Sequence, residues 1–260
     1  MAVVIGIIAL LAGLGLPAIR TLYKSFESQG GAKSMISGAL ASARAIAARD
    51  SRYAGIRFER DSEGGLYMVF ITHDRGATGL SPGFRAVEGV KPIKLPDAAG
   101  VTDLMVRSDP GDASRTVDES LAEAHLDDGD AANVGPDGEN ARLRDTCTFS
   151  IIFSSTGKLV RQDVRVRNRN GVYQPNNALG KVSRDDVFNS PQNIADGVGM
   201  FVQDDYPELG LGAEPSRNRF VIYDKNTFDA CPNAAARFNY LVTLPFTYIN
   251  AYTGTIVSSD

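Results

Sequence analysis

The chain begins with an uninterrupted apolar run, and a helical pattern continues beyond it to about residue 50. Residues 1–19 carry no charge, and Arg20 is the first charged residue. A helix of about 20 apolar residues spans the hydrocarbon core of a bilayer. After the run, apolar residues recur at helical spacing on one face. We therefore expect one long helix with an apolar first half and an amphipathic second half.

Pro17 and the glycines before it form a weak point in the apolar half. Pro17 has no backbone N–H, and its ring clashes with the carbonyl of Gly13. The segment Gly13–Pro17 is therefore expected to kink or melt. Two outcomes stay open: a membrane helix with a tolerated kink, or an extended segment whose backbone groups are satisfied inside an assembly.

The amphipathic half has two apolar stripes, separated by Gly30 and Gly31. Small residues are dense in Ser37–Ala48, so another element can pack closely there. We expect Met35–Ala48 to be buried against a sheet of the same chain, and Ala18–Gln29 to form a stem that faces other chains. The first stripe comprises Ile19, Leu22 and Phe26, and the second comprises Ile36, Leu40, Ala43 and Ala47.

Beyond the helix the hydrophobic period changes from 3.6 to 2, which indicates strands. Ala54, Ile56 and Phe58 fall on one face of the first strand. A turn over Asp61–Gly65 leads into the apolar run Leu66–Ile71. This order predicts a β-hairpin with a Gly-rich loop.

A second hairpin is predicted further along the chain. Its first strand is Thr148–Phe153, its turn is Ser154–Gly157 and its return strand is Lys158–Arg167. Valines such as Val164 and Val166 alternate with charged residues in the return strand. One face should therefore be packed, and the other should carry a row of charge.

These elements together predict an α+β fold, in which a long N-terminal α-helix packs by its second half on an antiparallel β-sheet with long loop insertions. Residues 1–29 would form the apolar helix and stem, and residues 30–260 a globular head domain. Further strands are predicted over Gly89–Ile93, Thr102–Val106, Phe220–Tyr223, Tyr240–Leu244 and Thr247–Val257, the last interrupted at Ala251–Gly254.

Two long polar insertions interrupt the pattern. Residues 109–145 hold seven acidic residues between Asp118 and Asp137, and a short helix is predicted over Asp118–His125. Residues 181–216 are rich in Asp, Asn, Gly and Pro. Loops of this length are uncommon inside compact domains and usually carry a specialised surface or are disordered.

Composition and motifs give no indication of an enzyme. A net charge of −4 leaves no overall footprint for nucleic acid, and 43% hydrophobic residues are ordinary for a soluble fold. The two histidines, His73 and His125, have neither zinc-site spacing nor an identifiable nucleophile partner. No phosphate-binding glycine loop or nucleophile elbow occurs.

Two charged clusters are candidates for binding. Carboxylates in the first insertion could wrap a calcium ion, although their spacing differs from an EF-hand, and a solvated acidic loop is the alternative. A basic row on the second hairpin could contact DNA phosphates, but a solvated strand face is favoured over nucleic acid because the row contains Asp163 and few aromatics. The calcium candidates are Asp127, Asp128, Asp130 and Asp137, and the basic row comprises Lys158, Arg161, Arg165, Arg167 and Arg169, with Arg142 and Arg144 nearby.

The N-terminal segment resembles the N-terminal helix of type IV pilins and type II secretion pseudopilins. The similarity lies in the apolar stretch Val3–Leu11, the proline in Leu16–Ile19 and the amphipathic continuation, and it covers roughly residues 1–55. The Ala- and Arg-rich helix feeding a hairpin, Ala39–Glu59, is similar to the H-type minor pseudopilins. When aligned on Pro17, the chain lacks that family's basic leader, processing site and glutamate. We therefore expect the mature protein to extend upstream of Met1.

The resemblance implies a structural role. Such a subunit is processed by a prepilin peptidase, waits in the inner membrane as a single-pass precursor, and is drawn by assembly machinery into a homo-oligomeric filament in the periplasm or outside the cell. No cofactor is expected other than the calcium ion considered above, which the resemblance slightly favours because some major pseudopilins bind calcium in a late loop. It assigns assembly to apolar residues of the stem, namely Ile5, Ile8, Leu11, Leu14, Pro17, Leu22 and Phe26.

Export, which the resemblance implies, would let Cys147 and Cys231 oxidise to a disulfide, and two unpaired thiols are the alternative. Two other functions stay open. The chain could be a low-copy minor pseudopilin at the tip of a type II secretion filament, or a membrane-anchored extracytoplasmic binding domain that never polymerises.

Overall fold

The computed structural model describes residues 30–61, 63–78, 81–108, 117–130, 133, 140–167, 187–189, 199–202 and 213–258. No helix within these ranges combines the length and the apolar character that a membrane span requires. The apolar run over residues 1–19 lies outside the described residues. So do all the stem residues assigned to assembly, namely Ile5, Ile8, Leu11, Leu14, Pro17, Leu22 and Phe26.

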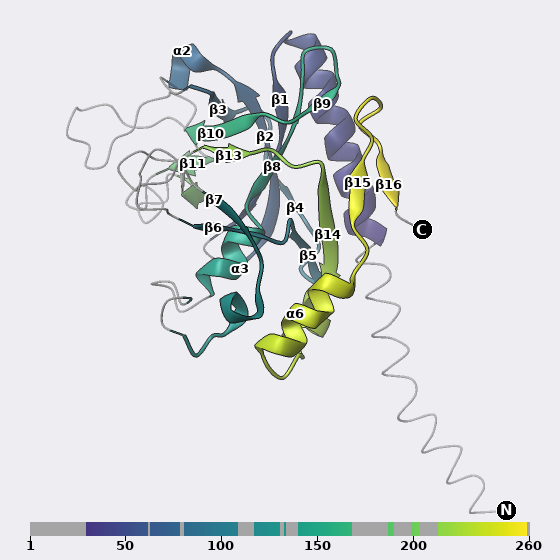
Figure 1. Ribbon diagram of the computed structural model, residues 1–260. Coiled ribbons are helices and arrows are strands. Elements are labelled where there is room, and N and C mark those ends of the chain that lie inside the picture. The colour runs from purple at the N-terminus through teal and green to yellow at the C-terminus, as the bar shows by residue number, and fades with distance from the viewer. Residues whose placement is uncertain are drawn as a thin grey trace, which may run out of the picture.

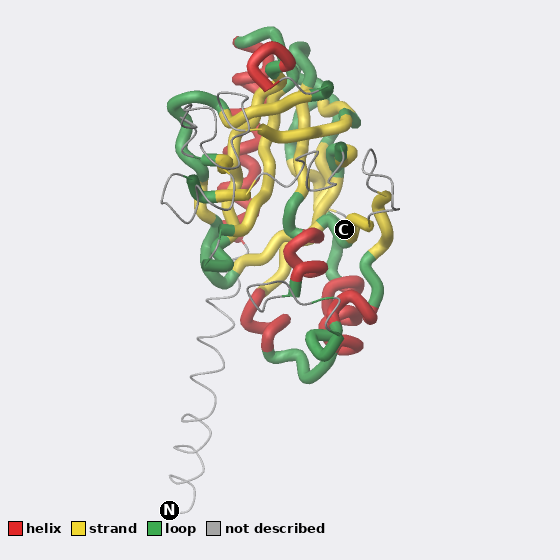
Figure 2. Tube along the Cα trace, turned by 90° about the vertical axis from the view of Figure 1, so that its left-hand side faces the viewer, coloured by secondary structure: helices red, strands yellow, loops and turns green. Residues whose placement is uncertain are grey.

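A helix over residues 30–49 opens the described part of the chain and lies along the strands (Figure 1, Figure 2). The predicted stripe is confirmed, because Ile36, Leu40, Ala43 and Ala47 have no exposed surface. They share one core with Ala54, Ile56 and Phe58 of strand β1 (Ala54–Arg60) and with apolar residues of its neighbours. The small side chains allow the close helix–sheet approach that the sequence predicted.

Arg44 fastens the outer side of this helix to the two chain turns beside it. Its Nε donates to the carbonyl of Gly157 at 2.9 Å, and its Nη1 donates to the carbonyl of Thr253 at 2.8 Å. A side chain on Gly157 would lie 2.9 Å from Arg44 Nε, and its φ is +74°. A glycine is therefore required where the helix meets this turn.

The helix packs on a mostly antiparallel sheet whose strands follow the order β13-β10-β3-β2-β1-β8-β9, with β4 paired to β2. The first predicted hairpin is confirmed as β1 and β2, which pair from Ala54↔Thr72 to Arg60↔Leu66. The pairing of β10 with β3 is parallel. The other strands are β2 (Leu66–His73), β3 (Gly83–Ala86), β4 (Ile93–Lys94), β8 (Phe149–Phe153), β9 (Leu159–Val160), β10 (Asp163–Arg167) and β13 (Glu214–Pro215).

The sheet curls, so its second face is also buried. Val69, Ile71, Phe84 and Val164 form a second core on the face away from the helix. A hydrogen bond connects the segment after β13 to the segment before β10: the backbone N–H of Ser216 donates to the carbonyl of Gln162 at 2.8 Å. Strand β1 is consequently buried on both faces.

The predicted second hairpin forms only in part. Strand β8 pairs with β9 through Ile152↔Val160 and Phe153↔Leu159. The predicted return strand Lys158–Arg167 is then interrupted at residues 161–162, and β10 crosses to lie beside β3. The curl of the sheet explains the break, because one straight strand cannot pair with both ends of a curled sheet.

A smaller sheet has the order β16-β15-β14-β5, and helices α5 and α6 lie between β14 and β15 in the chain. The predicted strand over Tyr240–Leu244 is wrong, because these residues mostly belong to helix α6 (Ala234–Thr243), which Asn233 caps through its side chain. The Asn233 cap and the Ala-rich first turn favour a helix. This preference outweighs the tendency of the β-branched residues Val242 and Thr243, at the helix end, to form a strand. The other elements here are β5 (Ala99–Thr102), β14 (Arg219–Asp224), β15 (Thr247–Ile249), β16 (Ile256–Ser258) and α5 (Lys225–Asp229).

Short elements complete the described chain. The helix predicted over Asp118–His125 is wrong in its first half, because strand β7 (Val117–Ser120) pairs with β6 (Met105–Ser108) there, and only the 3-10 turn η1 (Glu123–Leu126) follows. The strand predicted over Thr102–Val106 is split at Leu104, whose φ is 59°. The remaining elements are α2 (Arg75–Thr78), α3 (Ala141–Thr146), β11 (Phe188–Asn189) and β12 (Phe201–Val202).

The described residues therefore form a mixed helix and sheet fold with a curled sheet that is rich in antiparallel pairs. This agrees with the predicted α+β class. The apolar first half of the predicted long helix lies outside the described residues.

Candidate functional site

A buried ionic cluster lies on the face of β1 that points away from the helix. Strand alternation places Arg57 and Glu59 opposite the apolar residues that contact the helix. Arg57 has no exposed surface, and it donates to the carboxylates of Glu59 and Glu214 and to Ser150 Oγ at 3.1 Å. Glu214 of β13 is 2% exposed. A charge buried this deeply requires such partners, because desolvation of an ion is costly.

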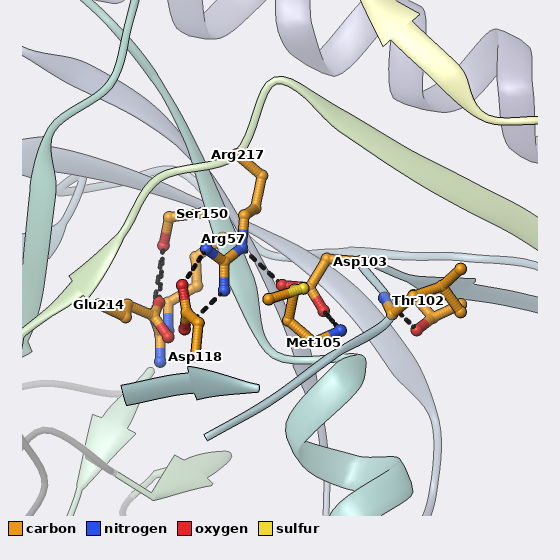
Figure 3. A network of polar contacts seen from close by, with 9 residues as sticks. Arg57, Thr102, Asp103, Met105, Asp118, Ser150, Glu214 and Arg217 are labelled. Carbon is orange, nitrogen blue, oxygen red and sulfur yellow. Dashed lines mark hydrogen bonds and ion pairs between the residues drawn. The ribbon is translucent and has the colours of Figure 1, made fainter. Parts of the chain in front are cut away.

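A second cluster lies beside the first and is centred on Arg217 (Figure 3). Arg217 Nε donates to Asp103 at 2.6 Å, and its two terminal nitrogens donate to Asp118 at 2.6 and 3.0 Å. Its backbone N–H donates to the carbonyl of Ser150 at 2.7 Å, so Ser150 contacts both clusters. The Arg217 side chain thereby joins the β5–β6 connection to β7.

Burial shapes the electrostatics of this second cluster. It raises the pKa of Asp103 to about 7, while Arg217 and the backbone N–H of Met105 act to lower it. Burial acts to lower the pKa of Arg217, but the carboxylates of Asp118 and Asp103 raise it above its usual value. Arg217 therefore stays charged, and Asp103 is the group that takes up a proton near neutral pH.

A hollow of about 670 Å³ opens above the Arg217 cluster. Its walls come from four segments, 103–118, 159–161, 216–219 and 248–251, which are linked to one another by hydrogen bonds. Gln162 N–H donates to Ser216 Oγ at 2.9 Å, and Ile249 N–H donates to the carbonyl of Asn218 at 3.0 Å. The lining includes Asp103, Asp118, Arg161, Arg217, Arg219 and Tyr248.

The calcium candidates do not form a metal centre within the described residues, where no group of three metal-ligating side chains occurs. Asp127 Oδ1 accepts the N–H of Gly129 at 2.9 Å, which is a turn contact. Asp128 accepts from Asn140 Nδ2 at 3.1 Å and pairs with Arg237. Asp137 lies outside the described residues.

The predicted basic row is divided by the break in its strand. Arg161 faces the hollow, whereas Arg165 lies on β10 with a buried Nε. Lys158 lies over the ring of Tyr252 at 5.6 Å. Arg142 and Arg144 belong to helix α3, which precedes β8, and not to the strands of the row, and Arg169 lies outside the described residues. The described part of the row does not form one continuous face.

The two cysteines are free in the structure, so the predicted disulfide is not formed. Cys147 is 2% exposed, and its Sγ lies 3.9 Å from Tyr223 Oη in the core. Burial raises the pKa of its thiol. Cys231 follows α5, and its Sγ contacts the carbonyl of Thr227 at 3.4 Å. The two sulfurs thus have separate partners.

The two histidines have structural surroundings. His73 ends β2, and its ring packs edge-on against Phe84 at a centroid distance of 5.4 Å. Burial lowers its pKa. His125 Nδ1 accepts the backbone N–H of Ala122 at 3.1 Å, which closes the start of η1.

Sequence reasoning missed the ionic clusters. The sequence does carry one signal, because Arg57 and Glu59 interrupt an otherwise apolar strand at alternate positions. Their partner Glu214 lies 157 residues away from Arg57, inside a predicted polar insertion, so the pairing depends on the tertiary fold. Comparison of the chain with protein-family models, with curated proteins and with solved structures finds no match.

Proposed function

We propose that the chain is a structural subunit of a type IV pilus-like or pseudopilus filament, drawn from the membrane through its N-terminal segment. One observation carries the proposal. The helix over residues 30–49 lays a fully buried stripe on an antiparallel sheet, and the residues before it include a run of 19 uncharged residues. This chain order gives a folded head at the end of an apolar stem.

The proposal depends on what buries the apolar stem. The apolar stripe of residues 30–49 is already buried against the sheet of the head. The apolar run before it has no polar face to turn toward water, so it requires lipid or other apolar helices. Exchange of lipid contacts for packing among copies of the same stem would build a filament core.

A charge in the stem tests the proposal. Ile8→Asp should abolish filaments in cells, because an aspartate in the core recurs in every subunit. In the membrane the same aspartate costs about 2.5–3.5 kcal/mol at mid-helix. Lys91→Asp, at an exposed position of the head, is the matched control and should assemble normally. Electron microscopy of cells expressing each variant gives the result, and circular dichroism checks that both heads remain folded.

Each outcome discriminates between functions. Loss of filaments with a folded head supports a polymer held by its stem. Normal filaments from Ile8→Asp would refute this role. A wild-type chain that stays monomeric in the membrane fraction would indicate an anchored binding domain, and filaments containing only a few copies of the chain would indicate a minor pseudopilin.

A further inference from the structure

We propose that the hollow above Arg217 binds a small acidic sugar, with its carboxylate held by Arg161 and Arg219 and its ring placed against Tyr248. The hollow has a volume of about 670 Å³, within the range of about 300–1,000 Å³ typical of small-molecule sites. It lies on the head, and this inference does not depend on the filament role.

Charge selects the ligand class. Arg217 is already neutralised by Asp103 and Asp118. Arg161 and Arg219 also line the hollow, and neither has a carboxylate within ion-pairing distance among the residues that the structure describes. The lining thus holds three arginines against two carboxylates, and the positive charge in excess favours an anion; the planar guanidinium suits a carboxylate.

The geometry of Arg219 supports a prepared site. Its guanidinium lies over the ring of Phe246, 4.4 Å from the centroid, so its position is restrained before a ligand arrives. Arg219 pairs directly with Tyr248 across β14 and β15, which places both side chains on the same face of the sheet. The Tyr248 side chain is 38% exposed, although large aromatics are usually more buried.

The exposed face beside the hollow indicates a ligand with a ring. Tyr248 is also paired with Val257 of β16, which is 47% exposed. These residues offer an apolar platform beside Arg219, and Tyr248 lines the same hollow as Arg161. A uronic acid matches both features, because its C–H face packs on an aromatic ring while its carboxylate accepts from arginine. The amide of Asn218, also in the lining, can contact hydroxyl groups.

Saturation-transfer NMR and calorimetry with D-galacturonate test the inference, using D-galactose as the neutral probe. The full-length chain is kept in an uncharged, sugar-free detergent. Galacturonate should bind and galactose should bind at least about tenfold more weakly, because it lacks the charge-assisted hydrogen bonds. Arg161→Gln and Arg219→Gln should each weaken galacturonate binding about tenfold. Arg75→Gln, an exposed arginine of α2, should not change it.

The controls keep the test decisive. Arg161 and Arg219 are exposed, so their variants should retain the wild-type melting profile. Tyr248→Ser should reduce the transfer of saturation to the sugar ring protons while leaving the charge dependence. Equal binding of the two sugars, no binding of galacturonate, or unchanged binding by both arginine variants would overturn the proposal. Tighter binding of a tetraglutamate peptide than of galacturonate would point instead to an acidic peptide partner.

Discussion

The buried arginine of β1 gives the sharpest test of how this head is held together. Arg57 has no exposed surface and donates hydrogen bonds to two carboxylates, those of Glu59, which is 6% exposed, and Glu214, which is 2% exposed. Arg57→Met keeps an unbranched apolar side chain in place of the arginine stem but leaves two acidic groups in a buried site without this cation. Removal of one partner from a buried ion pair costs about 3–5 kcal/mol. This is a large share of the roughly 5–15 kcal/mol that stabilises a typical domain.

A compensating change shows whether the cost arises from the stranded carboxylates. Arg57→Met combined with Glu214→Gln should recover about 1–3 kcal/mol of the loss, since an amide is easier to bury than a carboxylate. Arg49→Met is the matched control. Arg49 also pairs with a carboxylate, that of Asp50, but on the surface, and its variant should unfold like the wild type.

Urea unfolding of the full-length chain in detergent, followed by circular dichroism, measures these effects as shifts in midpoint at constant slope. The expected order of stability is wild type and Arg49→Met, then the double variant, then Arg57→Met. An Arg57→Met variant within about 1 kcal/mol of wild type would refute the reasoning. A double variant less stable than the single one would show that Glu214 is not the stranded group.

Three further predictions concern other parts of the head. Leu40→Ala on the buried helix stripe should lower the free energy of unfolding by about 3–5 kcal/mol, whereas Ser42→Ala on the exposed side should not change the urea midpoint. Burial holds the pKa of Asp103 at about 7 in the folded state, against about 4 in the unfolded state. Between these pH values the folded state binds more protons, so the free energy of unfolding falls as the pH rises from about 4 to about 7. Asp103→Asn should remove up to about 4 kcal/mol of that fall, and superimposable pH profiles for the two proteins would contradict it. Alkylation of the native protein without reductant should label Cys231 and spare the buried Cys147 until urea is added, whereas no labelling of either in urea until a reductant is added would establish the disulfide.

The local elements of the fold were largely set by the sequence. The stripe of Ile36, Leu40, Ala43 and Ala47 predicted which side of the helix would be buried, because helical periodicity fixes one face regardless of what covers it. The first hairpin followed from alternation and a Gly-rich turn, which are also local signals. The interruption of the last predicted strand at Ala251–Gly254 was correct as well, since β15 and β16 flank it.

The tertiary structure decided what local signals could not. Curling of the sheet broke the return strand after β9 and buried both faces of β1, so a charged row became partly internal. It also brought Glu214 to Arg57 and Asp103 to Arg217, pairs separated by more than 100 residues. Buried ion pairs and the hollow above them depend on which distant segments meet, and periodicity within one segment carries no information about that. The physical reason is that burial is a property of the whole fold, whereas the hydrophobic pattern reports only one element at a time.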